Sequence, residues 1–269
     1  MKLSVELVDL IFSFLVSHCG TLLTCSDIPE LSQIVERHLY HYITVHFQSH
    51  SLCDSFYTSE STIPILVSLI SENPRILHHV RVLRIRVILD HHYDFELERD
   101  LDVKQDLDNF AKTLLLFPAL KCIELETSKK RPFSWPDVFR AALEDRLSLP
   151  ILKELHIVGN QDFPCSLIDN RENIEDLVVS ARGGFLDAEP QVCVSTEATF
   201  PQLKSLALLS LPYRQSFLPS IIPHAHRLRS FKCASSAVKL LPEFLGICSK
   251  TLNKLDIDFL HSECKFQVG

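Results

Sequence analysis

The chain has 269 residues, of which 46% are hydrophobic and 23% charged, and its formal net charge is −7. Such a composition supplies enough apolar side chains for a packed core, which excludes intrinsic disorder. The acidic balance argues against a nucleic-acid partner. The six glycines are too few for phosphate-binding loops or a many-turned β-barrel. We therefore expect a packed scaffold, either one elongated domain or two small ones.

The nine cysteines are scattered, and none forms the CxxC pair that a zinc site needs. We interpret them as reduced, mostly buried thiols in a reducing compartment. The N-terminus does not resemble a signal peptide, because Asp9 interrupts its apolar stretch and Lys2 is the only basic residue before it. No apolar run approaches the roughly 20 residues that span a bilayer. The sequence predicts an intracellular protein, cytoplasmic or nuclear.

Residues 4–16 are predicted to form a helix with an unusually wide apolar surface. At about 100° per residue, the polar side chains of Glu6, Asp9 and Ser13 fall together, and apolar side chains occupy about two thirds of the circumference. One interpretation is a central helix buried by its own chain. The other is a helix that packs on its own chain with one face and on a separate protein with the other. The short segment that follows, residues 21–25, offers little cover and favours an external partner.

The same residues resemble a known family. Residues 3–15, LSVELVDLIFSFL, resemble the opening of an F-box, residues 21–26 its second helix, and residues 32–45 the closing segment of fungal-type F-box proteins. This resemblance implies that residues 1–47 form a helical docking segment for a Skp-type adaptor, which links to a cullin-based ubiquitin ligase. It implies adaptor contacts from eight side chains: Leu3, Glu6, Leu7, Leu10, Ile11, Phe12, Phe14 and Leu15.

An apolar-x-x-apolar-x-apolar pattern recurs through the rest of the chain. Its central positions are residues 83, 123, 155, 177, 206, 231 and 255, and four of the six spacings fall within the roughly 20–29-residue period of leucine-rich repeats. The last two apolar residues of each copy share one face of a short strand. The residue between them points to the other face, which applies to Glu124, His156, Val178, Ala207, Lys232 and Asp256.

Helical patterns separate several of these strands, at Thr62–Glu72, Asp106–Phe117, Pro136–Leu147 and Ala237–Leu252. The alternation predicts an α/β fold, with residues 48–269 forming a leucine-rich-repeat solenoid of about seven irregular repeats. Parallel strands would line its concave face and helices its convex face. An ordinary α/β sandwich is the alternative. This half also resembles the repeats of F-box proteins, in which that order of modules is common.

No catalytic signature is present, since GxSxG, HExxH, P-loop and GxGxxG motifs are all absent. His91 and His92 lie among acidic residues, which fits either a weak divalent-metal site or a solvated charged loop, and we favour the loop. The basic run at residues 129–131 is interpreted as a solvated loop, with a contact for an acidic partner as the alternative. We expect no catalytic residue, no metal and no cofactor.

Two functional hypotheses follow. An enzyme is a third, which the absence of catalytic motifs disfavours. The first is a non-catalytic substrate-receptor subunit of a cullin-type (SCF) E3 ubiquitin ligase. Its docking segment would bind a Skp-type adaptor, and its repeats would bind an unidentified target protein, with no nucleic acid or membrane as partner. The alternative is a leucine-rich-repeat binding module without ligase coupling. It is motivated by Ser4, where the F-box pattern has proline, and by the divergent residues 26–36.

Overall fold

The computed structural model describes residues 8, 11, 28, 31–52, 56–89, 97–127, 135–159, 171–180, 200–209, 222–234 and 241–258. Its strands are β1 (Tyr42–Leu52), β2 (Phe56–Ser61), β3 (Val82–Leu89), β4 (Cys122–Thr127), β5 (Glu154–Val158), β6 (Asp176–Ser180), β7 (Ser205–Leu209), β8 (Ser230–Ala234) and β9 (Lys254–Asp258). Its helices are α3 (Ser32–Leu39), α4 (Ile63–Glu72), α5 (Leu97–Leu114), α6 (Asp137–Leu147) and α8 (Leu241–Cys248), with 3-10 turns η2 (Pro74–His78) and η4 (Ile222–Arg227). Across these ranges, we find no helix whose length and apolarity would suit a membrane span.

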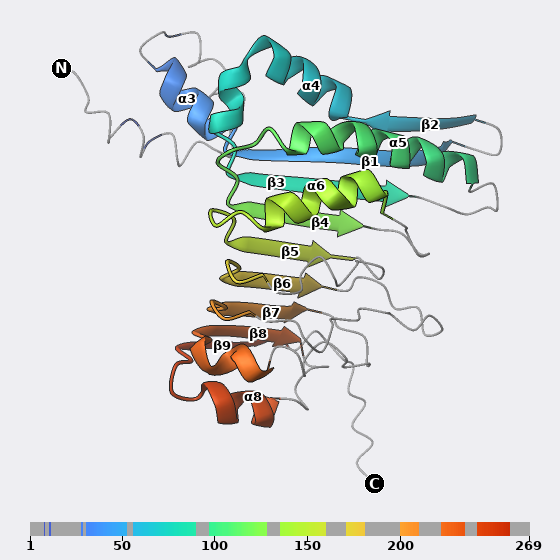
Figure 1. The fold of residues 1–269 in the computed structure, drawn as a ribbon. Coiled ribbons are helices and arrows are strands. Elements are labelled where there is room, and N and C mark those ends of the chain that lie inside the picture. The colour runs from blue at the N-terminus through green and yellow to red at the C-terminus, as the bar shows by residue number, and fades with distance from the viewer. Residues whose placement is uncertain are drawn as a thin grey trace.

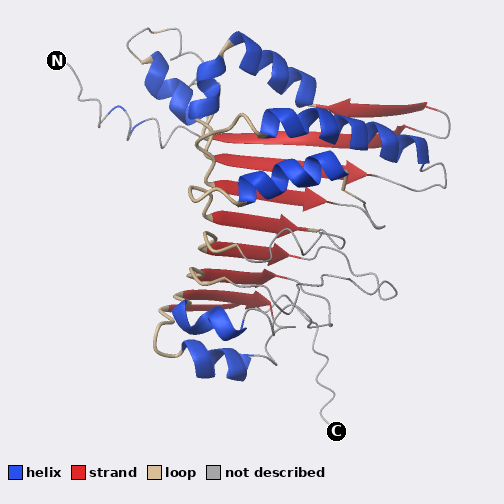
Figure 2. Ribbon diagram, in the orientation of Figure 1, coloured by secondary structure: helices blue, strands red, loops and turns tan. Residues whose placement is uncertain are grey.

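The nine strands of the described ranges belong to one sheet, in the order β2-β1-β3-β4-β5-β6-β7-β8-β9 (Figure 1). The β2 strand runs antiparallel to β1, and every other pairing is parallel. Helices alternate with strands along much of the chain, and α5 and α6 lie over one face of the sheet (Figure 2). The predicted α/β fold with a parallel sheet is therefore confirmed, and all seven copies of the apolar pattern coincide with strands, β3 to β9.

The predicted helices differ in how well they match. The α4 and α6 helices agree closely with the expected ranges, and Pro136 directly precedes α6 as its N-cap. The α5 helix starts at Leu97, well before the predicted Asp106. The α8 helix is shorter than predicted and has Pro242 in its first turn, where the missing N–H has no intrahelical partner to lose. Within residues 171–180 and 200–209, the structure contains strands and no helix.

An eighth parallel strand, β1, was not predicted as a strand. Residues 32–45, which resemble the end of an F-box, divide into α3 and the first part of β1. Val45 and Phe47 are each 1% exposed, and their alternation with Thr44 and His46 is the pattern of a half-buried strand. The expected boundary between residues 1–47 and 48–269 thus falls inside β1.

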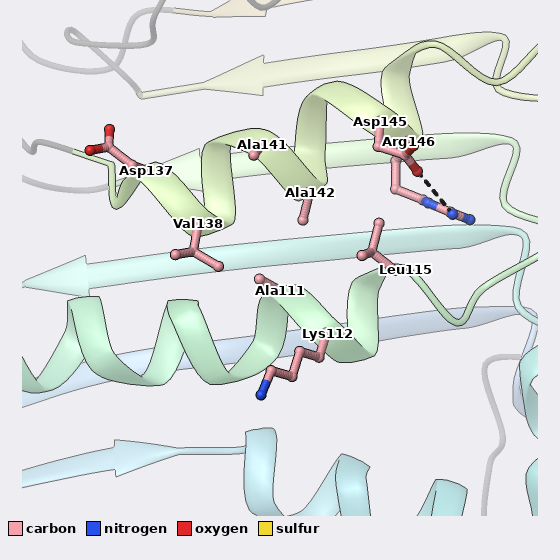
Figure 3. Close-up of a pocket in the computed structure, with 9 residues that line it drawn as sticks. All are labelled: Ala111, Lys112, Leu115, Asp137, Val138, Ala141, Ala142, Asp145 and Arg146. Atoms are coloured by element: carbon pink, nitrogen blue, oxygen red, sulfur yellow. Dashed lines mark hydrogen bonds and ion pairs between the residues drawn. The ribbon is translucent and has the colours of Figure 1, made fainter.

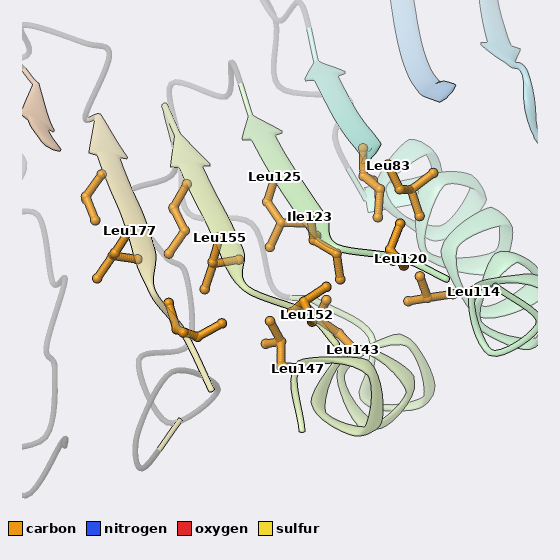
Figure 4. Close-up of a cluster of buried hydrophobic side chains, with 14 of the residues drawn as sticks. Leu83, Leu114, Leu120, Ile123, Leu125, Leu143, Leu147, Leu152, Leu155 and Leu177 are labelled. Atoms are coloured by element: carbon orange, nitrogen blue, oxygen red, sulfur yellow. The ribbon is translucent and has the colours of Figure 1, made fainter. Parts of the chain in front are cut away.

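The core lies between the sheet and the helices. The inward strand positions, such as Leu83, Ile123, Leu125, Leu155 and Leu177, are fully buried. Those of β3 to β5 face the buried side chains of α5 and α6 (Figure 4). The first apolar residue of six copies is buried as well, in the turn before the strand; these residues are Val80, Leu120, Leu152, Ile174, Leu203 and Leu228. Each of these copies therefore adds three apolar side chains to one continuous core, at about 1.5–3 kcal/mol for each large side chain buried.

A backbone ladder fixes where each strand begins. The residue just before a strand donates its N–H to the carbonyl oxygen of the equivalent residue one strand earlier. The steps are Arg81 to His41, Lys121 to Arg81, Lys153 to Lys121, Glu175 to Lys153, Lys204 to Glu175, Arg229 to Lys204 and Asn253 to Arg229, all between 2.7 and 2.9 Å. This unbroken series keeps neighbouring strands in the same register.

Polar side chains close the turns that precede the strands. Asn173 donates through Nδ2 to the carbonyl oxygens of Leu147 (3.1 Å), Leu149 (3.0 Å) and Leu152 (2.7 Å), all in the preceding copy. Other copies use different donors for the same purpose: Arg146 to Phe117, Arg227 to Pro201 and Thr251 to His226. A mixed set of donors thus satisfies carbonyl groups in the turns, which are costly to leave unpaired.

We predict that Asn173→Ala lowers the free energy of unfolding by about 1–3 kcal/mol, because part-buried carbonyl groups lose their donor. Asn109→Ala is the matched control, since Asn109 is exposed on α5 and should change stability by less than about 0.5 kcal/mol. Urea unfolding of the two variants and the wild type measures the difference. Equal midpoints for both variants would contradict the role given to Asn173.

Candidate functional site

The face of the sheet opposite α4, α5, α6 and α8, here called the open face, carries the alternate residues of each strand. Parallel register places these residues in rows. One row runs Thr44, Arg84, Glu124, His156, Val178, Ala207, Lys232 and Asp256, and it contains all six residues that the sequence assigned to the second face. A flanking row runs Tyr42, Val82, Cys122, Glu154, Asp176, Ser205, Ser230 and Lys254. In the first row, charged residues occupy β3 to β5, and small or apolar residues occupy β6 and β7.

Six side chains of this face, Tyr42, Arg84, Arg86, Glu124, Glu126 and His156, form what we call the charged cluster. At its centre Glu126 is only 4% exposed and receives hydrogen bonds from Nη2 and Nε of Arg84 at 2.6 and 3.1 Å. Nε of Arg86 lies 2.9 Å from the same carboxylate oxygen. Burial by itself would raise the pKa of Glu126, but the hydrogen bonds and charges of the two arginines outweigh burial and lower it.

The second carboxylate of the cluster, Glu124, connects to three other strands. It accepts a hydrogen bond from the Tyr42 hydroxyl at 2.8 Å, lies 3.3 Å from Nδ1 of His156, and forms an ion pair with Arg84 at 3.5 Å. The hydrogen bond from His156 lowers the pKa of Glu124. For His156, burial opposes the charged form, but the contact with Glu124 prevails and raises the pKa. Opposite charges are therefore fixed against each other across β3 and β4, and β5 contributes the imidazole of His156.

Next to the charged cluster, three residues with metal-ligating side chains lie close together. One ligand atom from each of Cys122, Glu154 and His156 lies within 4.8 Å of the other two. Sequence reasoning missed this group, because Cys122 is far from Glu154 and His156 in the chain. The Glu154-x-His156 spacing places both on one face of β5, but only the register with β4 adds Cys122.

On the helical side, an open groove of about 670 Å³ lies between α5 and α6 (Figure 3). Its apolar lining comes from Ala111, Leu115, Val138, Ala141 and Ala142, and the charged side chains Lys112, Asp137, Asp145 and Arg146 complete it. None of these lining residues is a histidine, a cysteine or a hydroxyl residue. The groove thus offers apolar contact rather than a nucleophile or an imidazole base.

Most of the predicted adaptor contacts lie outside the described residues. Ile11 is the exception among Leu3, Glu6, Leu7, Leu10, Ile11, Phe12, Phe14 and Leu15: it is helical and 42% exposed. Val8, three residues before it, packs against a small cluster around Val35 of α3, which includes Leu31, Ile34 and Leu39. Val8 thus contacts the chain itself, and Ile11 is exposed.

Of the other residues that the sequence singled out, some lie within the described ranges and some outside them. Cys122, Cys233 and Cys248 are buried free thiols, as expected, and burial raises the pKa of each. His91, His92 and the basic residues 129–131 lie outside the described ranges.

Comparisons with protein-family models, with curated proteins and with solved structures give no match to this chain. The family resemblance noted in the sequence therefore stays a prediction.

We predict that Glu126→Gln destabilises the protein by about 1–3 kcal/mol at neutral pH, since two arginines lose a buried anionic partner. A lowered folded-state pKa means that the carboxylate stabilises the fold above its unfolded pKa, near 4.5. That contribution is lost as the pH falls through the folded pKa. The stability difference between wild type and variant should therefore shrink below about pH 4.5.

Urea unfolding of the wild type and Glu126→Gln at neutral and acidic pH measures this stability difference. Glu175→Gln serves as the control, because Glu175 pairs with Lys153 and Lys204 at a more exposed edge and should cost less than about 1 kcal/mol. A pH-independent difference for Glu126→Gln would contradict the assigned ion pairs.

Proposed function

We propose that this protein is a non-catalytic target-binding subunit that joins a target protein to a Skp-type adaptor and, through it, to a cullin-type ubiquitin ligase. In this proposal the sheet is a leucine-rich-repeat solenoid, and its open face is the concave face that binds the target. The N-terminal segment supplies the adaptor contacts. The observation that carries the proposal is the open face itself, where parallel register sets rows of ordered polar side chains beside one another.

The order of the open face suits recognition of a protein. Arg84 and Glu126 hold each other in place across neighbouring strands, and near the other end Lys232 lies 3.5 Å from Asp256 in a half-exposed ion pair. Between these ends lie Val178 and Ala207, which offer apolar contact. Side chains that are already fixed lose less conformational entropy on binding, which favours a partner with matching charges.

The N-terminal segment supports the adaptor part of the proposal. Ile11 is a large aliphatic side chain that is 42% exposed, so an adaptor can reach it. Val8 contacts the Val35 cluster of α3, so in this proposal residue 8 faces the chain and residue 11 faces the adaptor.

We predict that the full chain co-purifies with a Skp-type adaptor and that Ile11→Asp abolishes this binding, because a carboxylate would be desolvated in an apolar interface. Ile65→Asp is the matched control, since Ile65 is 69% exposed on α4 and should leave adaptor binding unchanged. Lys232→Glu on the open face should also leave it unchanged. Pull-down after co-expression with the adaptor measures binding, and far-UV circular dichroism of each purified variant measures folding. Failure of the folded wild type to bind the adaptor would refute the ligase proposal.

The alternative, a binding module without ligase coupling, draws on the contact between Val8 and the Val35 cluster. In that module the N-terminal segment would act as a cap that stabilises the sheet, rather than as a docking element.

Deleting residues 1–39 separates the two proposals, because this cut keeps β1 and Tyr40, which packs against the main core, whereas a cut at residue 48 would remove the buried Val45 and Phe47. The α3 cluster is distinct from the main core, so the docking proposal predicts that residues 40–269 melt within a few degrees of the full chain. A large fall in melting temperature would support the cap and weigh against docking. Differential scanning calorimetry of the two proteins gives the answer.

A further inference from the structure

The group formed by Cys122, Glu154 and His156 combines the three kinds of donor atom that zinc binds in proteins. A thiol sulfur, a carboxylate oxygen and an imidazole nitrogen lie within 4.8 Å of one another. Cys122 and Glu154 are register partners on β4 and β5, and His156 follows on the same face of β5. The three donors are thus carried by two hydrogen-bonded strands of the sheet, which keeps their backbone positions fixed.

The surroundings of His156 resemble the outer shell of a metal site. Its Nδ1 is 3.3 Å from Oε1 of Glu124, and Glu124 also accepts a hydrogen bond from the Tyr42 hydroxyl. Metal-binding histidines commonly donate one ring N–H to a carboxylate, which fixes the ring and leaves the other nitrogen to bind the metal. Here the contact with Glu124 leaves Nε2 for that purpose.

The charges beside the group favour a cation. Asp176 is the register partner of Glu154 on β6, and its carboxylate acts electrostatically on both Cys122 and His156. In the part of the chain that the structure describes, neither Glu154 nor Asp176 forms an ion pair with a lysine or arginine. The carboxylates of the charged cluster, by contrast, have cationic partners. A divalent cation would compensate this local excess of negative charge.

We propose that Cys122, Glu154 and His156 bind one Zn²⁺ ion on the open face, with Glu124 as the outer-shell partner of His156. Tetrahedral zinc holds its ligand atoms about 3.5 Å apart, so closing the site requires side-chain rotations that bring the three atoms, now within 4.8 Å, closer together. Binding replaces the Cys122 S–H bond with an S–Zn bond and uses the neutral imidazole of His156, so the thiol proton and, from a charged His156, the Nε2 proton pass to solvent. Mg²⁺ and Ca²⁺ fit this donor set poorly, because they favour sets made of oxygen ligands alone. Three protein ligands leave the fourth position to water.

Cobalt titration of the full-length, metal-free chain in a phosphine reductant tests this proposal. We expect a thiolate-to-cobalt charge-transfer absorption that saturates at one Co²⁺ per chain and is abolished by added Zn²⁺ but not by Mg²⁺. Cys122→Ser should remove this absorption, and Glu154→Gln and His156→Gln should each weaken binding. Glu124→Gln should weaken zinc binding roughly 10–100-fold, because it keeps the ligands and removes the outer-shell carboxylate.

Cys248→Ser is the matched control, since Cys248 is buried in α8 and its thiol donates to the carbonyl oxygen of Phe244, a bond that serine can also make. It should leave the absorption unchanged. Glu154 and His156 are not buried, so Glu154→Gln and His156→Gln should fold. These two variants keep the proposal testable if Cys122→Ser fails to fold. At the same zinc concentration, the rise in melting temperature should be larger for the wild type than for His156→Gln. Absence of the absorption in the wild type, or its persistence in Cys122→Ser, would overturn the proposal.

Discussion

The register of the parallel sheet is set at the N-terminal ends of its strands. There the residue before each strand donates its N–H to the carbonyl oxygen of its counterpart one strand earlier. The ladder from His41 to Asn253 is continuous, so a side chain at a given position in one strand lies beside the same position in the next. Both faces depend on this constraint. On the helical face it aligns the apolar residues of successive copies into one core, and on the open face it aligns polar residues into rows.

The consequences of register differ between the two faces. Apolar register partners such as Ile123 and Leu155 need only similar size to pack, so the core tolerates irregular spacing between copies. Charges need a particular neighbour, and the open face provides it: Arg84 lies beside the Glu126 carboxylate, and Glu124 beside His156. Most of the charge on β3 and β4 is therefore engaged within the sheet. A binding partner would meet an ordered pattern of charges rather than a set of mobile side chains.

The sequence was most informative where apolar periodicity alone decides structure. Seven strands and the outward direction of Glu124, His156 and Lys232 followed from the recurring pattern, because burial depends on local alternation. The β1 strand was missed although Val45 and Phe47 alternate with polar residues, since the resemblance to an F-box suggested another role for that segment. Asn173 was missed because the donor that closes the turns differs from copy to copy. The Cys122 group could not be predicted, because it depends on the pairing of strands that are distant in sequence.

The antiparallel β2 strand bears on how such a chain can grow during evolution. A duplicated strand-and-helix unit can be inserted between two parallel strands, because both of its edges then meet partners of the same direction. It cannot be added outside β2 with the same pairing, since β2 runs opposite to β1. The hairpin of β1 and β2 therefore marks a fixed origin for the array. A further copy with parallel pairing fits only on the β3 side of this hairpin.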